Sequence, residues 1–176
     1  MSNGNMVIAY IAVGANIEPH RNIVEALSLL SKRIPVVGVS TFYRSAPLDR
    51  PSQADYLNGV VAAKTDMGAM RLKRRVLQLV ESKLGRVRTA DRFAARSIDL
   101  DLILYGGDVV SSETLILPDP DIRQRAFVAL PLSEVAPGLR LPDTGEALAE
   151  LTVLNERDGL TPDVELTRRV KERLGL

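Results

Sequence analysis

The sequence predicts an α+β fold: a ferredoxin-like βαββαβ core with helices packed on an antiparallel sheet, followed by a C-terminal helical extension. Two observations lead to this fold class. Segments with the apolar period of strands and segments with that of helices follow one another in this order up to Tyr105. The chain has 176 residues, 45% hydrophobic and 26% charged, which is typical of one globular domain.

An apolar run and a helical spacing indicate the first strand and the first helix. Residues 6–13 are predicted to form a buried strand that ends at Gly14. Pro19 suits the first turn of the following helix, because its missing N–H has no partner to lose there. Apolar residues then recur at near-helical spacing until Pro35 stops the helix, namely Ile23, Leu27, Leu30 and Ile34.

The second and third strands, 36–43 and 56–64, are separated by the proline-rich connection 44–55. Hairpin loops usually have about two to five residues, so this longer connection is typical of a functional loop or lid. A second helix is predicted with Asp66 as its N-cap and Gly85 in the left-handed position after its end. Its apolar stripe consists of Leu72, Val76, Leu79 and Val80.

A fourth strand, 98–105, completes the βαββαβ order and ends at Gly106. Because side chains alternate along a strand, its core face is predicted to carry Ile98, Leu100, Leu102 and Leu104. A shorter hairpin follows it. The segment 121–136 comes next, with a helix expected around 131–135.

The tail of the chain has the signals of one more helix. Thr161 is predicted as its N-cap, Pro162 as its first residue and Gly175 as the residue after its end. Its apolar face carries Leu166, Val170 and Leu174. We expect this face to pack on the rest of the same domain, with contact between copies of the chain as the alternative.

The composition excludes several kinds of site and partner. The absence of cysteine excludes disulfides and thiolate sites and suits a cytoplasmic location. The single histidine, His20, is expected to be a solvated residue of a first helical turn. A net charge of +1 gives no basic field for nucleic acid, and no apolar run is long enough to span a membrane. We therefore expect neither nucleic acid nor a membrane as a partner.

The most informative segment joins an arginine-rich loop to the fourth strand. Asp99 and Asp101 lie on one face of that strand, roughly 7 Å apart along it. The loop before them contains Arg86, Arg88, Arg92 and Arg96. Arginine binds phosphate oxygens in a bidentate fork, and Mg²⁺ takes one or two carboxylates together with phosphate oxygens. A salt-bridge network is the alternative, but four arginines favour a site for a magnesium-bound nucleotide. No Walker-type phosphate loop is present.

Six motifs in a fitting order connect this segment to a known family. They are Ala12–Asn16, Phe42–Leu48, Gln53–Asn58, Gly85–Arg88, Arg92–Asp101 and Arg125–Phe127. Together they make the chain resemble the 6-hydroxymethyl-7,8-dihydropterin pyrophosphokinases of folate biosynthesis. The resemblance implies a catalytic domain over residues 1–151, with residues 152–176 as its C-terminal helical extension.

The resemblance implies an enzyme, an ATP-dependent diphosphotransferase. It would transfer the β,γ-diphosphate of ATP to the hydroxymethyl group of the pterin and release AMP. Two Mg²⁺ ions would bind Asp99 and Asp101, and the catalytic set would be these aspartates with Arg86, Arg88 and Arg96. Both substrates are small molecules, and the protein is expected to be a monomer.

The family also implies which residues bind each substrate. Those implied for ATP are Gln78, Glu81, Arg86, Arg88, Arg92, Phe93, Arg96, Asp119 and Arg125. Those implied for the pterin are Ser45, Pro47, Leu48, Tyr56, Asn58, Phe93, Arg125 and Phe127. Tyr56 and Phe127 would stack on the flat ring, and the Asn58 amide would pair with a ring donor and acceptor. Without the resemblance, Glu81 would be interpreted as a solvated helix residue.

One departure from the family pattern and two other functions are also considered. The family usually has histidine in the segment where this chain has Asp119, and an ionised aspartate repels a phosphate to which histidine donates. A palm-type nucleotidyltransferase would need a basic groove for a template, which the net charge disfavours. An RNA-binding module would need exposed aromatic residues on its central strands, where this chain has two carboxylates.

Overall fold

The computed structural model describes residues 5–47, 52–86, 94–157 and 159–176, and its main sheet has the predicted topology. The order across the sheet is β5-β1-β4-β3-β8, with β2 also paired to β4, and every pair is antiparallel. These strands are β1 (Val7–Ala15), β2 (Val36–Val39), β3 (Tyr43–Ser45), β4 (Tyr56–Thr65), β5 (Asp99–Tyr105) and β8 (Thr161–Pro162). The placement of the last core strand beside the first confirms the ferredoxin-like α+β prediction.

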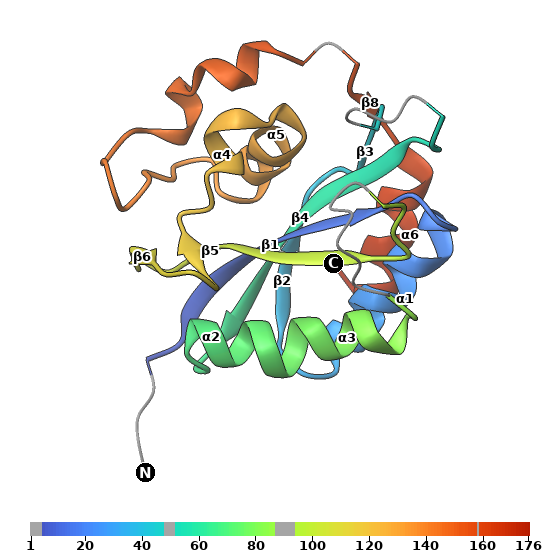
Figure 1. Cartoon of the computed structure of the whole chain (residues 1–176), viewed down its shortest axis with the longest axis horizontal. Coiled ribbons are helices and arrows are strands. Elements are labelled where there is room, and N and C mark those ends of the chain that lie inside the picture. The colour runs from blue at the N-terminus through green and yellow to red at the C-terminus, as the bar shows by residue number, and fades with distance from the viewer. Residues whose placement is uncertain (1–4, 48–51, 87–93, 158) are drawn as a thin grey trace.

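Helices cover both faces of this sheet (Figure 1). One core lies under α1 (Pro19–Ser31), the helix formed by residues 69–83, and α6 (Val164–Leu174). A second core lies on the opposite face, under α4 (Asp121–Gln124), α5 (Ala126–Val135) and the 3₁₀ turns η2 (Leu148–Glu150) and η3 (Thr152–Asn155). The predicted short hairpin is formed by β6 (Val110–Ser111) and β7 (Ile116–Leu117). No helix in the described parts of the chain has the length and apolarity needed to cross a membrane.

The second helix differs from its prediction because a π turn interrupts it. It consists of α2 (Ala69–Leu72), the π segment η1 (Lys73–Leu77) and α3 (Gln78–Lys83), and its N-cap is Gly68 instead of Asp66. In the π turn, the Gln78 N–H donates to the Lys73 carbonyl, five residues earlier. The extra residue rotates the following turn, so that Leu79 is 38% exposed while Glu81 is only 2% exposed. The solvated interpretation of Glu81 is therefore wrong.

A β-bulge changes which face of the sheet the side chains near the end of β5 occupy. Tyr10 on β1 pairs with Leu104, but the next residue, Ile11, pairs with Leu102, which leaves Ile103 as an extra residue. As predicted, Ile98, Leu100 and Leu102 lie in the core under α1. Leu104 was predicted on that face but lies in the core under α5, because the bulge shifts the alternation beyond Leu102.

Three other boundaries also differ from the sequence prediction. The strand expected over 36–43 is broken into β2 and β3, which pair with different parts of β4. The helix expected around 131–135 begins earlier, at Ala126, and contains Pro131. The N-cap of α6 is Asp163 instead of Thr161, because Thr161 and Pro162 join the sheet as β8.

Candidate active site

A pocket of about 380 Å³ lies on the face of the sheet that carries α5. The ends of β1, β4 and β5 form its floor, while the connection after β3 and the start of α5 form its walls. Ten of the residues singled out in the sequence line it, namely Ser45, Pro47, Tyr56, Asn58, Arg96, Asp99, Asp101, Asp119, Arg125 and Phe127. Segments far apart in the chain therefore meet in one cavity.

One part of the pocket combines aromatic rings with an amide. Tyr56 and Asn58 point into it from β4, and Phe127 reaches it from the first turn of α5. The Asn58 Nδ2 donates to Ser45 Oγ on the neighbouring strand at 2.8 Å, which fixes the orientation of the amide. The Tyr56 hydroxyl donates to the Ala94 carbonyl at 3.3 Å, and burial raises the pKa of this phenol. This part can hold a flat ring that also has hydrogen-bonding edges.

Asp99 and Asp101 line the part of the pocket above β5. The Asp101 carboxylate is open to the pocket, yet the surrounding protein removes much of its hydration. This desolvation, followed by the negative charges of Asp99 and Glu81, raises the pKa of Asp101 to about 7. No ion pair to Asp101 is found among the described residues. The pocket therefore contains a carboxylate that a cation would stabilise in its ionised form.

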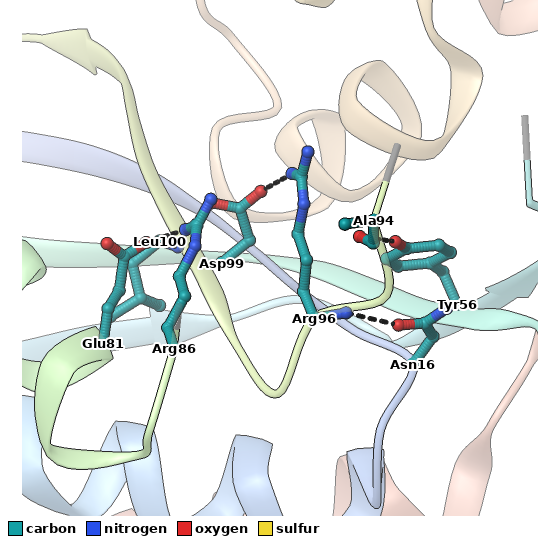
Figure 2. Close-up of polar contacts among 8 residues, drawn as sticks. All are labelled: Asn16, Tyr56, Glu81, Arg86, Ala94, Arg96, Asp99 and Leu100. Atoms are coloured by element: carbon teal, nitrogen blue, oxygen red, sulfur yellow. Dashed lines mark hydrogen bonds and ion pairs between the residues drawn. The ribbon is translucent and has the colours of Figure 1, made fainter. Parts of the chain in front are cut away.

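Two arginines hold the Asp99 carboxylate from either side (Figure 2). Arg86 bonds to one carboxylate oxygen and Arg96 to the other, and Arg86 also bonds to Glu81. Glu81 in turn accepts from the Leu100 N–H at 2.9 Å. Burial alone would lower the pKa of Arg86, but the charges of Asp99 and Glu81 raise it above its ordinary value. The sequence predicted these arginines as phosphate ligands, and the structure adds that they neutralise Asp99.

Asn16 joins three segments at the edge of the pocket and was not predicted as a site residue. Its Oδ1 accepts from the Arg96 N–H at 2.8 Å, as Figure 2 shows. Its Nδ2 donates to Gln53 Oε1 and to the Ala54 carbonyl, both at 3.3 Å. The end of β1 is thereby hydrogen-bonded to the connection before β4, at Gln53 and Ala54, and to the loop before β5, at Arg96. Its position in the motif Ala12–Asn16 was the sequence signal that could have found it.

Not every predicted residue is part of the cavity wall. Gln78, Glu81 and Arg86 are absent from its lining, although Arg86 bonds to Asp99 of the lining and Glu81 bonds to Arg86. The lining also contains Gly14, Gln53 and Asp121, none of which was predicted to bind a substrate or a metal. Four predicted residues lie outside the described residues, namely Leu48, Arg88, Arg92 and Phe93.

Comparison with known proteins gives consistent matches. Residues 10–137 match the family model described as 7,8-dihydro-6-hydroxymethylpterin-pyrophosphokinase (HPPK). The chain is similar to the 2-amino-4-hydroxy-6-hydroxymethyldihydropteridine pyrophosphokinase of Haemophilus influenzae, with 38% identity over 142 residues, covering 79% of this chain and 88% of the relative. The enzyme of the same name from Pseudomonas aeruginosa is 36% identical over 154 residues, covering 86% of this chain and 93% of the relative.

Solved structures share the fold. A wild-type HPPK-DHPS structure from Plasmodium falciparum, with pterin and p-hydroxybenzoate, superposes with a TM-score of 0.67 at 12% identity. The match covers 100% of this chain and 44% of that chain, so this chain spans less than half the length of the solved protein. At this identity the likeness concerns the fold.

Proposed function

Because the chain belongs to the 7,8-dihydro-6-hydroxymethylpterin-pyrophosphokinase family, we propose that the pocket between β5 and α5 is where it performs diphosphoryl transfer. The chain is a pyrophosphokinase of folate biosynthesis, an ATP-dependent diphosphotransferase. One observation carries the assignment of the site: Tyr56, Asn58 and Phe127 share a cavity with Asp99 and Asp101. The same cavity therefore offers aromatic and amide groups for a flat pterin and carboxylates for the metal ions of a polyphosphate.

In this proposal the pterin ring lies between Tyr56 and Phe127. Stacking between aromatic faces holds a flat heterocycle without fixing its direction. Direction comes from the Asn58 amide, which Ser45 already orients through their 2.8 Å hydrogen bond. A site whose polar groups need partners rejects analogues that lack them more strongly than an apolar pocket does.

Asp99 and Asp101 fit a magnesium site completed by the substrate. The described residues contain no group of three side chains that could hold a metal ion. Two carboxylates are nevertheless what Mg²⁺ commonly takes from a protein when phosphate oxygens and water supply its other ligands. The raised pKa of Asp101 supports this, because desolvation and the negative charges of Asp99 and Glu81 outweigh the nearby positive charge of Arg86. Two bound Mg²⁺ ions would supply charge stabilisation on the triphosphate oxygens.

The arginines and the loops supply the remaining functions. Arg96 and Arg125 line the pocket and can bind the oxygens of the transferred diphosphate. Arg86 would join them after exchanging part of its contact with Asp99 for phosphate. No protein nucleophile is needed, because alignment of the hydroxymethyl oxygen with the β-phosphorus and charge stabilisation lower the barrier. The contacts of Asn16 and Tyr56 with the loop around residues 94–96 would help to exclude water.

The decisive experiment identifies the nucleotide that the protein releases. The protein is incubated with Mg-ATP, with and without 6-hydroxymethyl-7,8-dihydropterin, and the nucleotides are separated by chromatography. AMP that forms only with the pterin, together with pterin diphosphate, is the expected result. ADP, or AMP formed equally without the pterin, would contradict the proposed transfer. The Asp101→Asn variant should lose most of this AMP formation. The Asp108→Asn variant, which changes an exposed carboxylate outside the pocket lining, serves as its matched control.

A further inference from the structure

We propose that the C-terminal segment 161–176 positions the pterin site through the short strand β3, and that Asp163 is its central positioning residue. The family match ends at residue 137, so this segment lies beyond the region that defines the family. The inference rests on the proposed function, because it assumes that Asn58 binds the pterin.

The segment holds β3 through its backbone. β3 is only three residues long and pairs with β4 on one side. On its other side β8 pairs with it, Tyr43 opposite Pro162 and Arg44 opposite Thr161. A strand this short at the edge of a sheet frays easily unless its free side is covered. β8 provides that cover directly beside the loop that enters the pocket.

The side chain of Asp163 joins three elements at one point. Its Oδ1 accepts from the Leu166 N–H at 2.9 Å and so caps α6. Its Oδ2 lies 3.0 Å from His20 Nε2 at the start of α1 and 3.2 Å from an Arg44 nitrogen on β3. The side chain is only 11% exposed, whereas those of His20 and Arg44 are 39% and 47% exposed. A largely buried carboxylate thus links both partners to the cap of α6.

Phe42, just before β3, is held by the same segment at both of its backbone groups. Its carbonyl accepts from the Asp163 N–H at 2.7 Å, and its N–H donates to Thr167 Oγ1 at 2.9 Å. Thr167 completes the link by donating to the Asp163 carbonyl at 2.8 Å. The Phe42 ring is fully buried, and a Cβ on Gly59 would lie 2.7 Å from it. A shift of Phe42 toward Gly59 would therefore press on β4, the strand that carries Asn58.

The chain of contacts ends at the pterin site. Ser45 is the last residue of β3 and accepts the 2.8 Å hydrogen bond that orients Asn58. Displacing β3 would lengthen that bond and free the amide to rotate. The carboxylates on β5 lie across β1 and β4 from β3 and β8, and no hydrogen bond among the described residues joins them to the C-terminal segment. The segment should therefore affect recognition of the pterin more than recognition of ATP.

Steady-state kinetics with each substrate varied in turn tests this proposal. For Asp163→Ala and Thr167→Val, we expect the KM for the pterin to rise roughly five- to tenfold, the effect of weakening about one hydrogen bond between Asn58 and the ring. The KM for ATP and the kcat should stay within about twofold of wild type. Asp163→Asn keeps an acceptor for the Leu166 N–H but loses the charge facing Arg44, so its effect should be smaller than that of Asp163→Ala.

A variant of α6 that leaves β3 untouched separates positioning from stability. Leu174 packs on the core near the far end of α6, and Leu174→Ala should lower the Tm without changing the KM for the pterin. Equal pterin effects in Leu174→Ala and Thr167→Val, or none in Asp163→Ala and Thr167→Val, would overturn the proposal. Pterin affinity measured by fluorescence distinguishes a failure of the positioning proposal from a failure of the proposed diphosphoryl transfer. Wild-type protein that binds pterin without forming AMP contradicts the proposed function alone.

Discussion

Gly14 on β1 lies opposite Asn58 on β4, so close that a Cβ on residue 14 would be 2.9 Å from Asn58 Oδ1. On its other side Gly14 pairs with Asp99 on β5. It thus separates the amide proposed to read the pterin from a carboxylate proposed to hold Mg²⁺. A side chain here would enter the pocket between the two.

Replacing Gly14 by alanine should damage the site and spare the fold. The atom that the new methyl group meets is the end of the Asn58 side chain, which can rotate away without moving the backbone. Rotation would break the bond to Ser45 and misplace the amide. We expect the KM for the pterin to rise by about tenfold or more, with the Tm nearly unchanged. Kinetics and thermal unfolding of the same preparation check both parts.

Gly138→Ala is the control for this change. A Cβ on Gly138 would meet nothing within 4 Å, so the substitution should leave both the KM and the Tm at wild-type values. A Gly14→Ala enzyme with wild-type pterin kinetics would show that Asn58 keeps its orientation even when a methyl group occupies the space beside its Oδ1.

Asp101→Asn should remove most of the activity while the protein stays folded. The amide has nearly the shape of the carboxylate but lacks the charge that a magnesium ion needs. We expect kcat to fall by about two to three orders of magnitude, comparable to the loss of one electrostatic contact in other active sites. Circular dichroism verifies the fold, and full activity in this variant would overturn the metal assignment.

Asp101 should also make metal binding depend on pH near neutrality. Its pKa is raised from 3.8 to about 7, so the metal-free fold favours the protonated form. The protonated Asp101 carboxyl therefore contributes to the free energy of folding. This contribution is fully present below the pKa of the unfolded chain and is lost as the pH rises through about 7. Magnesium needs the ionised form, so its affinity should increase between pH 6 and pH 8. Calorimetric titration with Mg²⁺ and an unreactive ATP analogue measures this rise.

Proton release tests whether Asp101 is protonated before the metal binds, when wild type is compared with Asp101→Asn. Binding at pH 6 should release a proton to the buffer, detectable as a binding enthalpy that varies with the ionisation enthalpy of the buffer. Near pH 8 the release should be much smaller. A titration with no dependence on buffer at pH 6 would show that Asp101 is already ionised there.

The sequence predicted the parts of the fold and site that follow a regular period. The alternation in β5 placed Asp99 and Asp101 together, and the order of elements predicted the arrangement of the sheet. It failed where one extra residue breaks the period. The π turn rotated Glu81 into the interior, and the bulge at Ile103 turned Leu104 to the other core. Apolar spacing assumes a constant period, so it does not locate an extra residue in a helix or a strand.

The pairing of Asp99 with Arg86 and Arg96 is the salt-bridge network that stood as the alternative to a phosphate site in the sequence analysis. Spacing predicts which side chains are near one another, but it does not predict which partner each selects in the absence of substrate. The cap of α6 illustrates a third limit. Thr161 and Asp163 both have side chains suited to capping, and only the pairing of β8 with β3 decides for Asp163.

The last prediction concerns Asp119, which lines the pocket and stands where the family resemblance implies a histidine. Burial, opposed by a hydrogen bond from the Asp121 N–H, raises the pKa of its carboxyl above the ordinary value. That N–H lies 2.8 Å from Asp119 Oδ1. Asp119→Asn keeps this acceptor and removes a negative charge that faces the phosphate site. Its affinity for an unreactive Mg-ATP analogue should therefore rise, by about three- to tenfold.

Asp119→His should give tighter ATP binding with activity retained, because imidazole can donate to a phosphate oxygen. Asp108→Asn removes an exposed charge outside the pocket lining and controls for the change in net charge. Calorimetry gives the Kd of each variant, and the AMP assay gives its kcat. If charge repulsion is what Asp119 contributes, both Asp119 variants bind ATP more tightly than Asp108→Asn does. A large loss of kcat in both would instead assign the aspartate a role of its own in the transfer.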